Sequence, residues 1–140
     1  MPLPARNNYS LILYPFSMLY GLIVWIRNTL FDYDIIRSTE FPIPVISVGN
    51  ITVGGTGKTT HIEYLVELLK DEFNVSTLSR GYQRKTRNFI LADMDSGVSE
   101  IGDEPVQIKQ KYPDIQVAVD RRRVNGIREL MKRIPELDVI

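Results

Sequence analysis

The hydrophobic pattern begins with a long apolar stretch. Residues 7–26 contain no Asp, Glu, Lys, Arg or His, and Leu11–Ile26 is almost continuously apolar. A helix that spans a bilayer needs ~20 apolar residues, and this shorter stretch is also interrupted by Pro15 and Gly21. Its tyrosines and Trp25 suit the boundary between water and lipid. We therefore expect a helix that lies in or dips into one leaflet, with a single span and a core helix as alternatives.

From residue 41 onward, short apolar runs alternate with amphipathic segments. The runs predict strands at Val45–Val48, Val75–Leu78, Phe89–Ala92, Ile115–Val119 and Leu137–Ile140. Apolar spacing at i, i+3, i+4 and i+7 predicts a helix over 58–70, and similar patterns predict helices over 104–111 and 121–133. Strands alternating with helices predict a mainly parallel α/β sheet with helices on both faces.

The same pattern divides the chain into two parts. Residues 1–40 form a membrane-associating segment and its connector, and residues 41–140 form the α/β domain. The last apolar run begins at Leu137 and stops at Ile140. We therefore expect the domain to be truncated at its C-terminus and the chain to be the N-terminal part of a longer protein.

Composition excludes several kinds of site. The 140 residues suffice for one domain with a core. Lys and Arg together number 17, as do Asp and Glu, so the net charge gives no reason to expect nucleic acid as a partner. There is no cysteine, which excludes disulfides and thiolate sites, and His61 is a single histidine. No feature of the sequence indicates a protein partner.

The segment after the first predicted strand has the chemistry of a phosphate-binding loop. Its glycines allow tight turns, so backbone N–H groups can converge on phosphate oxygens at the start of the next helix. A lysine can reach the β- and γ-phosphates, and a hydroxyl can bind Mg²⁺. We therefore expect ATP and Mg²⁺ as ligands, with Thr59 on the metal, and assign the loop to Thr52, Val53, Gly54, Gly55, Thr56, Gly57, Lys58 and Thr59.

This loop departs from two known patterns. The general pattern G-x-x-x-x-G-K-[ST] has glycine where this chain has Thr52. One subgroup of P-loop ATPases has lysine where this chain has Val53. The strand, the glycine-rich core and the amphipathic helix nevertheless occur together, which favours nucleotide binding over a simple turn.

Three blocks together resemble the tetraacyldisaccharide 4'-kinase family of lipid A biosynthesis. They are Gly49–Thr59, Ser79–Tyr82 and Gly102–Pro105, in this order. The resemblance implies a P-loop NTPase-like fold and transfer of the γ-phosphate of ATP to the 4'-hydroxyl of tetraacyldisaccharide 1-phosphate, which gives lipid IVA. It also implies contact with inner-membrane lipids and a place on the cytoplasmic face of the bacterial inner membrane.

The resemblance also implies residue roles. Lys58 would bind the ATP phosphates, Asp103 would be the catalytic base, and Glu104 would assist Mg²⁺ or the active-site network. Substrate-binding positions would be Asn50, Arg80 and Tyr82. Family members continue past Ile140 with an Asp-Asp pair and a later histidine, so this chain alone is expected to be inactive.

Alternatives remain at two levels. Four cations between Arg80 and Arg87 form either a patch for the 1-phosphate or anionic headgroups, or a solvated loop. A membrane-bound P-loop ATPase switch would also use this loop, although it favours lysine at position 53. A small-metabolite kinase is the third function, and it would have no need of the apolar N-terminus.

Overall fold

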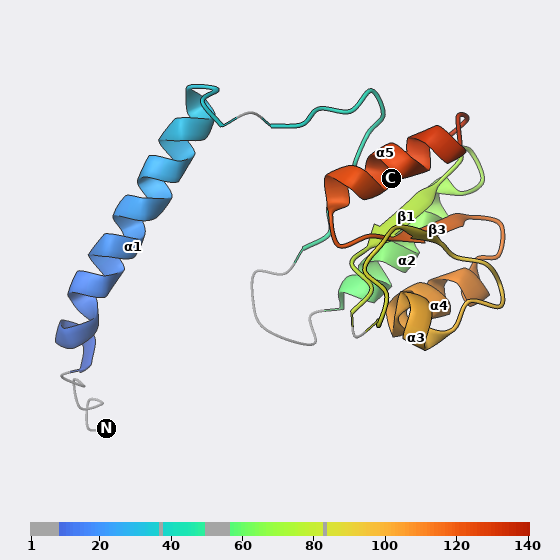
Figure 1. Cartoon of the computed structure of the whole chain (residues 1–140), viewed down its shortest axis with the longest axis horizontal. Coiled ribbons are helices and arrows are strands. Elements are labelled where there is room, and N and C mark those ends of the chain that lie inside the picture. Colours follow the sequence, from blue (N-terminus) through green and yellow to red (C-terminus); the bar gives the residue numbers. More distant parts are fainter. Residues whose placement is uncertain (1–8, 37, 50–56, 83) are drawn as a thin grey trace. The chain divides into compact units, whose positions relative to one another are not determined.

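The computed structural model describes residues 9–36, 38–49, 57–82 and 84–140. The chain divides into two units, Met1–Glu40 and Phe41–Ile140. The first unit contains a single described helix, α1 (Tyr9–Asp32), with Pro15 inside it (Figure 1). The helix continues past the apolar stretch to Asp32.

Helix α1 presents its apolar side chains to its surroundings. Tyr20 is 71% exposed and Trp25 is 63% exposed. Near the end of the helix, the Arg27 guanidinium lies 5.0 Å from the centre of the Phe31 ring. Within the described residues, no helix combines the length and the apolar character that crossing a bilayer requires.

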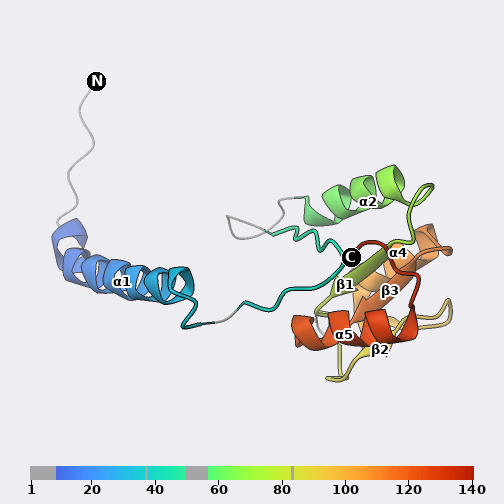
Figure 2. The same ribbon diagram turned by 90° about the horizontal axis from the view of Figure 1, so that it is seen from above.

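The second unit contains a small mixed sheet. Among the described residues its strands are β1 (Ser76–Ser79), β2 (Ile90–Leu91) and β3 (Gln116–Val119), in the order β1-β3-β2 (Figure 2). β1 pairs with β3 in parallel, and β2 pairs with β3 antiparallel. The segment between β1 and β2 passes the carboxyl end of β3 and re-enters the sheet there, with Ile90 opposite Val119. The sequence predicted a mainly parallel sheet. This prediction is wrong for β2, which runs antiparallel to β3.

Helices cover both faces of the sheet, as the sequence predicted. They are α2 (Lys58–Leu69), α3 (Val98–Ile101), α4 (Asp103–Lys111) and α5 (Arg123–Arg133). Figure 2 shows α2 and α5 on opposite sides of the sheet. The short helix α3 was not predicted, because four residues give no helical period.

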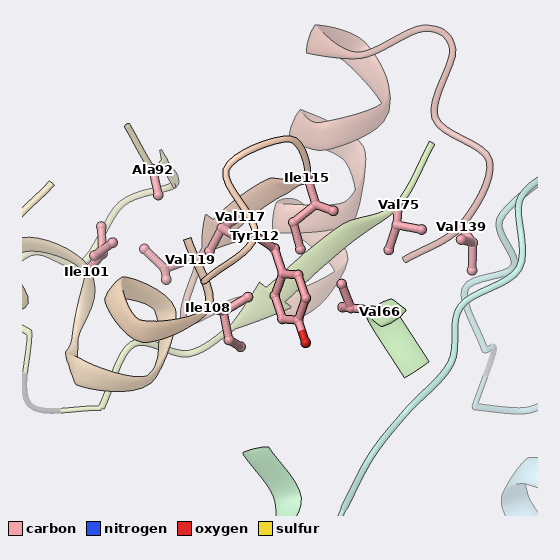
Figure 3. Packing of buried hydrophobic residues seen from close by; sticks show 10 residues of the cluster. All are labelled: Val66, Val75, Ala92, Ile101, Ile108, Tyr112, Ile115, Val117, Val119 and Val139. Atoms are coloured by element: carbon pink, nitrogen blue, oxygen red, sulfur yellow. The ribbon is translucent and has the colours of Figure 1, made fainter. Parts of the chain in front are cut away.

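The strand β3 places alternate side chains in two hydrophobic clusters. Val117 and Val119 belong to the cluster that includes Val66 of α2 and Ile108 of α4. Figure 3 shows Tyr112 in the middle of this cluster. Ala118 points to the other face and packs with Leu130 of α5, and both are fully buried. This period of two is what a strand covered on both faces requires.

The predicted strands Val45–Val48 and Leu137–Ile140 are not strands in the structure. Ile46 donates its N–H to the Ile140 carbonyl at 2.8 Å, and Ile140 donates to the Pro44 carbonyl at 3.1 Å. Val75 and Val139 form an isolated parallel bridge. These pairings are too few to make a ladder, since a strand needs successive pairs. Val45–Val48 therefore forms no strand, and Ile46 makes its backbone contact with Ile140.

Candidate functional site

The start of α2 carries the described part of the predicted phosphate loop. Gly57 precedes the helix with φ 73° and ψ 25°, a left-handed conformation that favours glycine. Lys58 and Thr59 are the first two residues of the helix, and Lys58 is exposed. The remaining predicted loop positions, Thr52, Val53, Gly54, Gly55 and Thr56, lie outside the described residues, as does the predicted substrate-binding residue Asn50.

A hydrogen bond joins the phosphate loop to the Gly-Asp-Glu-Pro block. The Thr59 hydroxyl donates to Glu104 Oε1 at 2.8 Å, across 45 residues of sequence. Glu104 lies in the first turn of α4 and is partly buried. The residue before it, Asp103, is exposed and accepts the Glu104 N–H on Oδ1 at 2.9 Å. The predicted catalytic residue Glu104 therefore contacts the predicted metal-binding hydroxyl, and the predicted base Asp103 is its neighbour in the chain.

Backbone packing brings the Ser-Arg-Gly-Tyr block to the same place. Gly102 has φ 95°, and a Cβ added to it would lie 3.0 Å from the Tyr82 carbonyl oxygen. A Cβ on Gly81 would lie 2.7 Å from the Ile101 carbonyl oxygen. Both positions require glycine because the two chain segments are in van der Waals contact. The described parts of the three blocks thus lie close together.

A cavity of about 780 Å³ connects these elements. Apolar side chains of Val45–Val48, α2 and β1 line much of it. Its polar lining includes Lys58, Arg80, Tyr82 and Glu104, which come from three different parts of the chain. We call it the central cavity. Its size lies in the range of small-molecule sites.

A second cavity of about 610 Å³ lies beside the loop that follows β1. Its charged lining is entirely basic and comprises Arg80, Arg84, Lys85, Arg87 and Arg121, which we call the arginine pocket. The two cavities share Arg80, Gly81 and Tyr82. Tyr82 is 78% exposed at this junction.

Arg84 holds the loop rather than extending into solvent. Its Nη1 donates to the Asn88 carbonyl at 2.9 Å and to the Val119 carbonyl at 3.4 Å. Desolvation lowers the pKa of the Arg84 guanidinium below its ordinary value, while the nearby Asp120 acts in the opposite direction. The sequence counted Arg84 only as one of four loop cations, since its burial depends on the folded loop.

Asp120 is a site residue that sequence reasoning missed. It follows β3, is 3% exposed, and accepts the Arg122 N–H at 2.8 Å and the Asn125 amide at 2.7 Å. These bonds satisfy donors at the start of α5, beside Arg121 of the arginine pocket. An aspartate that accepts the N–H two residues later is a turn signal that could have identified it.

Oxygen ligands for a metal are few in the described part of the chain. Within it, no group of three or more His, Cys, Asp or Glu side chains is arranged to hold a metal ion. Mg²⁺ commonly uses only one or two protein oxygens, together with water and substrate phosphates. The Thr59 hydroxyl and the Glu104 carboxylate fit that requirement.

Comparison with known proteins identifies relatives across most of the chain. The sequence model of the family described as tetraacyldisaccharide-1-P 4'-kinase matches residues 9–140. A tetraacyldisaccharide 4'-kinase of Flavobacterium johnsoniae is 56% identical over 129 residues, covering 92% of this chain and 38% of the relative. One of Phocaeicola vulgatus is 60% identical over 118 residues, covering 84% of this chain and 32% of the relative.

A solved structure is also similar. It is LpxK from Aquifex aeolicus in complex with ATP, with a TM-score of 0.74 and 38% sequence identity. The match covers 91% of this chain and 42% of that one. This chain therefore spans less than half the length of the relatives it matches.

Proposed function

Because this chain belongs to the tetraacyldisaccharide-1-P 4'-kinase family, we propose that it forms part of an enzyme that phosphorylates an acylated disaccharide. The γ-phosphate of ATP is transferred to the 4'-hydroxyl of tetraacyldisaccharide 1-phosphate, and ADP leaves. The product is lipid IVA, a lipid A precursor. The observation that carries this proposal is the 2.8 Å hydrogen bond from Thr59 to Glu104, which joins the phosphate loop to the acidic block.

The start of α2 binds the ATP phosphates in this proposal. The helix N-terminus favours negative charge, and its first N–H groups have no partner within the helix. Lys58 is exposed at this end and supplies a positive charge for the β- and γ-phosphates. The ATP complex of the Aquifex aeolicus relative supports ATP as the nucleotide.

Thr59 and Glu104 would hold Mg²⁺ through their oxygens. When bound, the metal neutralises charge on the phosphates and stabilises the charge that develops during transfer. The hydrogen bond between the two side chains keeps both oxygens at one place at the junction of α2 and α4. This role agrees with the low number of protein ligands that Mg²⁺ needs.

Asp103 acts as the base for the sugar hydroxyl. As the new O–P bond forms, the hydroxyl proton passes to the Asp103 carboxylate. The Glu104 N–H donates to Asp103 Oδ1, which orients the carboxylate and leaves Oδ2 for the substrate. Orientation matters most here, because phosphoryl transfer depends mainly on positioning and electrostatics. Arg80 and Tyr82 line the central cavity, as Glu104 does, and in this proposal they contact the sugar headgroup.

Helix α1 brings the enzyme to its lipid substrate. Its apolar side chains, such as Leu22 at 52% and Ile23 at 56% exposure, suit contact with acyl chains. We propose that α1 lies in the cytoplasmic leaflet of the inner membrane, where ATP is available. A membrane-bound ATPase switch has no such support, since the relatives described above carry the kinase name.

Transfer of labelled phosphate from ATP to the disaccharide lipid tests the proposal in the full-length protein. Lys58→Ala and Asp103→Ala should each reduce turnover by at least about 100-fold. Arg128→Ala is the matched control, since Arg128 is exposed on α5 and lines neither cavity. Wild-type turnover in both site variants would refute the assigned roles.

A further inference from the structure

Two polar contacts join α2 to α4, one helical turn apart. The first is the hydrogen bond from Thr59 to Glu104. The second is centred on Glu63, four residues further along α2. Its Oε1 accepts the side-chain amide of Gln107 at 3.1 Å, and its Oε2 accepts the ammonium of Lys111 at 2.7 Å. Because these contacts follow the same order along both helices, α2 and α4 run side by side in the same direction, and Glu63 is a second cross-link between them.

Helix α4 is fixed to the sheet. Its residues Pro105 and Ile108 are buried, and Ile108 packs in the cluster that contains the β3 valines. Lys109 is buried too, and its ammonium donates to the carbonyls of Pro113 at 2.8 Å and Ile115 at 3.0 Å. These bonds tie α4 to the segment that leads into β3. Helix α4 is therefore a fixed reference for its neighbour.

Helix α2 has much less apolar packing. Of its twelve residues, all within the described part of the chain, only Val66 is buried, and Ile62 and Leu69 pack against the same cluster while partly exposed. Thr59 lies seven residues before Val66, which is about 10 Å along the helix axis. A tilt of about 6° around Val66 would therefore displace Thr59 by about 1 Å. The polar contacts nearer to Thr59 set this tilt.

The geometry at Glu63 suits this role. Its two donors lie on successive turns of α4, so a shift of either helix along its axis would lengthen one of the two bonds. The Glu63 side chain is 16% exposed, so water screens its bond to Lys111 less than it screens a fully exposed ion pair. The Tyr112 hydroxyl adds a donor to the Glu63 carbonyl at 3.4 Å. Contacts from three residues of one chain segment thus converge on Glu63.

We infer that Glu63 is a positioning residue, which aligns the nucleotide-binding end of α2 with Asp103 on α4. This inference rests on the proposed function. The proposed nucleotide contacts Lys58 and Thr59 lie on α2 and would move with it, whereas the proposed base lies on α4. Loss of the alignment should therefore slow phosphoryl transfer without weakening ATP binding. A displacement of about 1 Å can cost about 100-fold in rate, because this reaction depends mainly on positioning.

Charge reversal in the full-length enzyme tests the inference. Glu63→Lys should lower kcat at least about tenfold and leave KM for ATP within about twofold of the wild-type value. Mg²⁺ would bind between Thr59 of α2 and Glu104 of α4, so the Mg²⁺ concentration for half-maximal activity should rise. The combination Glu63→Lys/Lys111→Glu restores opposite charges across the two helices and should reverse most of both effects. Glu63→Gln is a milder change that should act in the same direction, and it keeps the test valid if charge reversal prevents folding.

The next turn of α2 offers a matched control. Glu67 pairs with Lys70 of the same chain segment at 3.2 Å, so this ion pair does not reach α4. Glu67→Lys makes the same charge change as Glu63→Lys on the same helix. It should alter neither kcat nor the Mg²⁺ requirement.

A distance measurement tests the alignment without nucleotide or metal. Spin labels are attached to Thr60→Cys on α2 and Gln110→Cys on α4, both at exposed positions, in a background with no other cysteine. The distance distribution from pulsed EPR should shift or broaden in Glu63→Lys. It should return to the wild-type form in Glu63→Lys/Lys111→Glu and stay unchanged in Glu67→Lys.

Several results would overturn the inference. Wild-type kcat in Glu63→Lys would do so, with or without a change in the label distances. A loss of kcat that Glu63→Lys/Lys111→Glu does not reverse, or an equal loss in Glu67→Lys, would do so as well. These results leave the kinase proposal standing, because the wild-type enzyme is active in all of them. If the wild-type enzyme does not phosphorylate the lipid, the proposed function fails and the role of Glu63 in it fails too, even where the label distances confirm the contact.

Discussion

Replacing Thr59 by valine tests the contact between the phosphate loop and the acidic block. The change removes the hydroxyl that donates to Glu104 at 2.8 Å and keeps the branched shape of the side chain. Threonine and valine have similar helix propensities, so the helix itself contributes little to the difference. A hydrogen bond of this kind contributes about 0.5–1.5 kcal/mol net, and Glu104 remains partly solvated. We expect a loss of about 1 kcal/mol in the free energy of unfolding.

A double-mutant cycle isolates this contribution. Unfolding free energies are measured by denaturant titration for Thr59→Val, for Glu104→Ala, which removes the acceptor, and for the combination of both. We expect a coupling of about 0.5–1 kcal/mol, because each single change already breaks the same bond. Thr59→Ser keeps the hydroxyl and should keep most of the coupling. Single effects that add within about 0.3 kcal/mol would refute the contact.

The same variants separate structure from catalysis. In the full-length enzyme, Thr59→Val should lower kcat by about 10–100-fold, since it also removes an oxygen proposed to bind Mg²⁺. Thr59→Ser should retain most of the activity. Wild-type turnover by Thr59→Val would contradict the proposed metal role even if the stability effect is found.

Three further predictions concern packing, backbone and pH. Leu130→Ala should cost about 2–5 kcal/mol of unfolding free energy because Leu130 is fully buried. Leu68 is 62% exposed, so Leu68→Ala should cost little. Equal losses of unfolding free energy in the two variants would contradict the described core. Gly102→Ala should cost about 1–3 kcal/mol because φ is 95°, and an unchanged stability would exclude that conformation. A hydrogen bond from Lys111 holds the pKa of Glu63 below its ordinary value of 4.5. Its stabilising effect is therefore present above pH 4.5 and lost as pH falls through the lowered pKa, and Lys111→Met should return that pKa toward 4.5 in a carboxyl NMR titration.

The sequence predicted those elements whose signals are local. The apolar spacing over 58–70 and 121–133 identified α2 and α5 to within two residues, because a helical face is encoded by neighbours three and four apart. The family resemblance from three short blocks is confirmed by the match over residues 9–140. The presence of glycine in those blocks also has a local reason. Gly57 and Gly102 have positive φ, a backbone conformation that favours glycine.

Elements that depend on distant pairing were predicted less well. The direction of β2 is set by its partner β3, which lies more than twenty residues later in the chain. Val45–Val48 has strand composition, yet its described pairing reaches only Ile140. No local pattern contains this information, so both predictions failed for the same reason.

The candidate site shows the same division. The sequence was sufficient to propose four site residues: Lys58, Thr59, Asp103 and Glu104. It could not predict the hydrogen bond between Thr59 and Glu104. The anchoring role of Arg84 was missed too, since it depends on carbonyls that only the folded loop brings close.

The most direct test of the central claim is a crystal structure of the full-length protein with a nonhydrolysable ATP analogue and Mg²⁺. The account predicts that the β- and γ-phosphates lie at the start of α2, with Lys58 on their oxygens and the metal beside Thr59 and Glu104. A nucleotide bound elsewhere, with this end of α2 empty, would contradict the account.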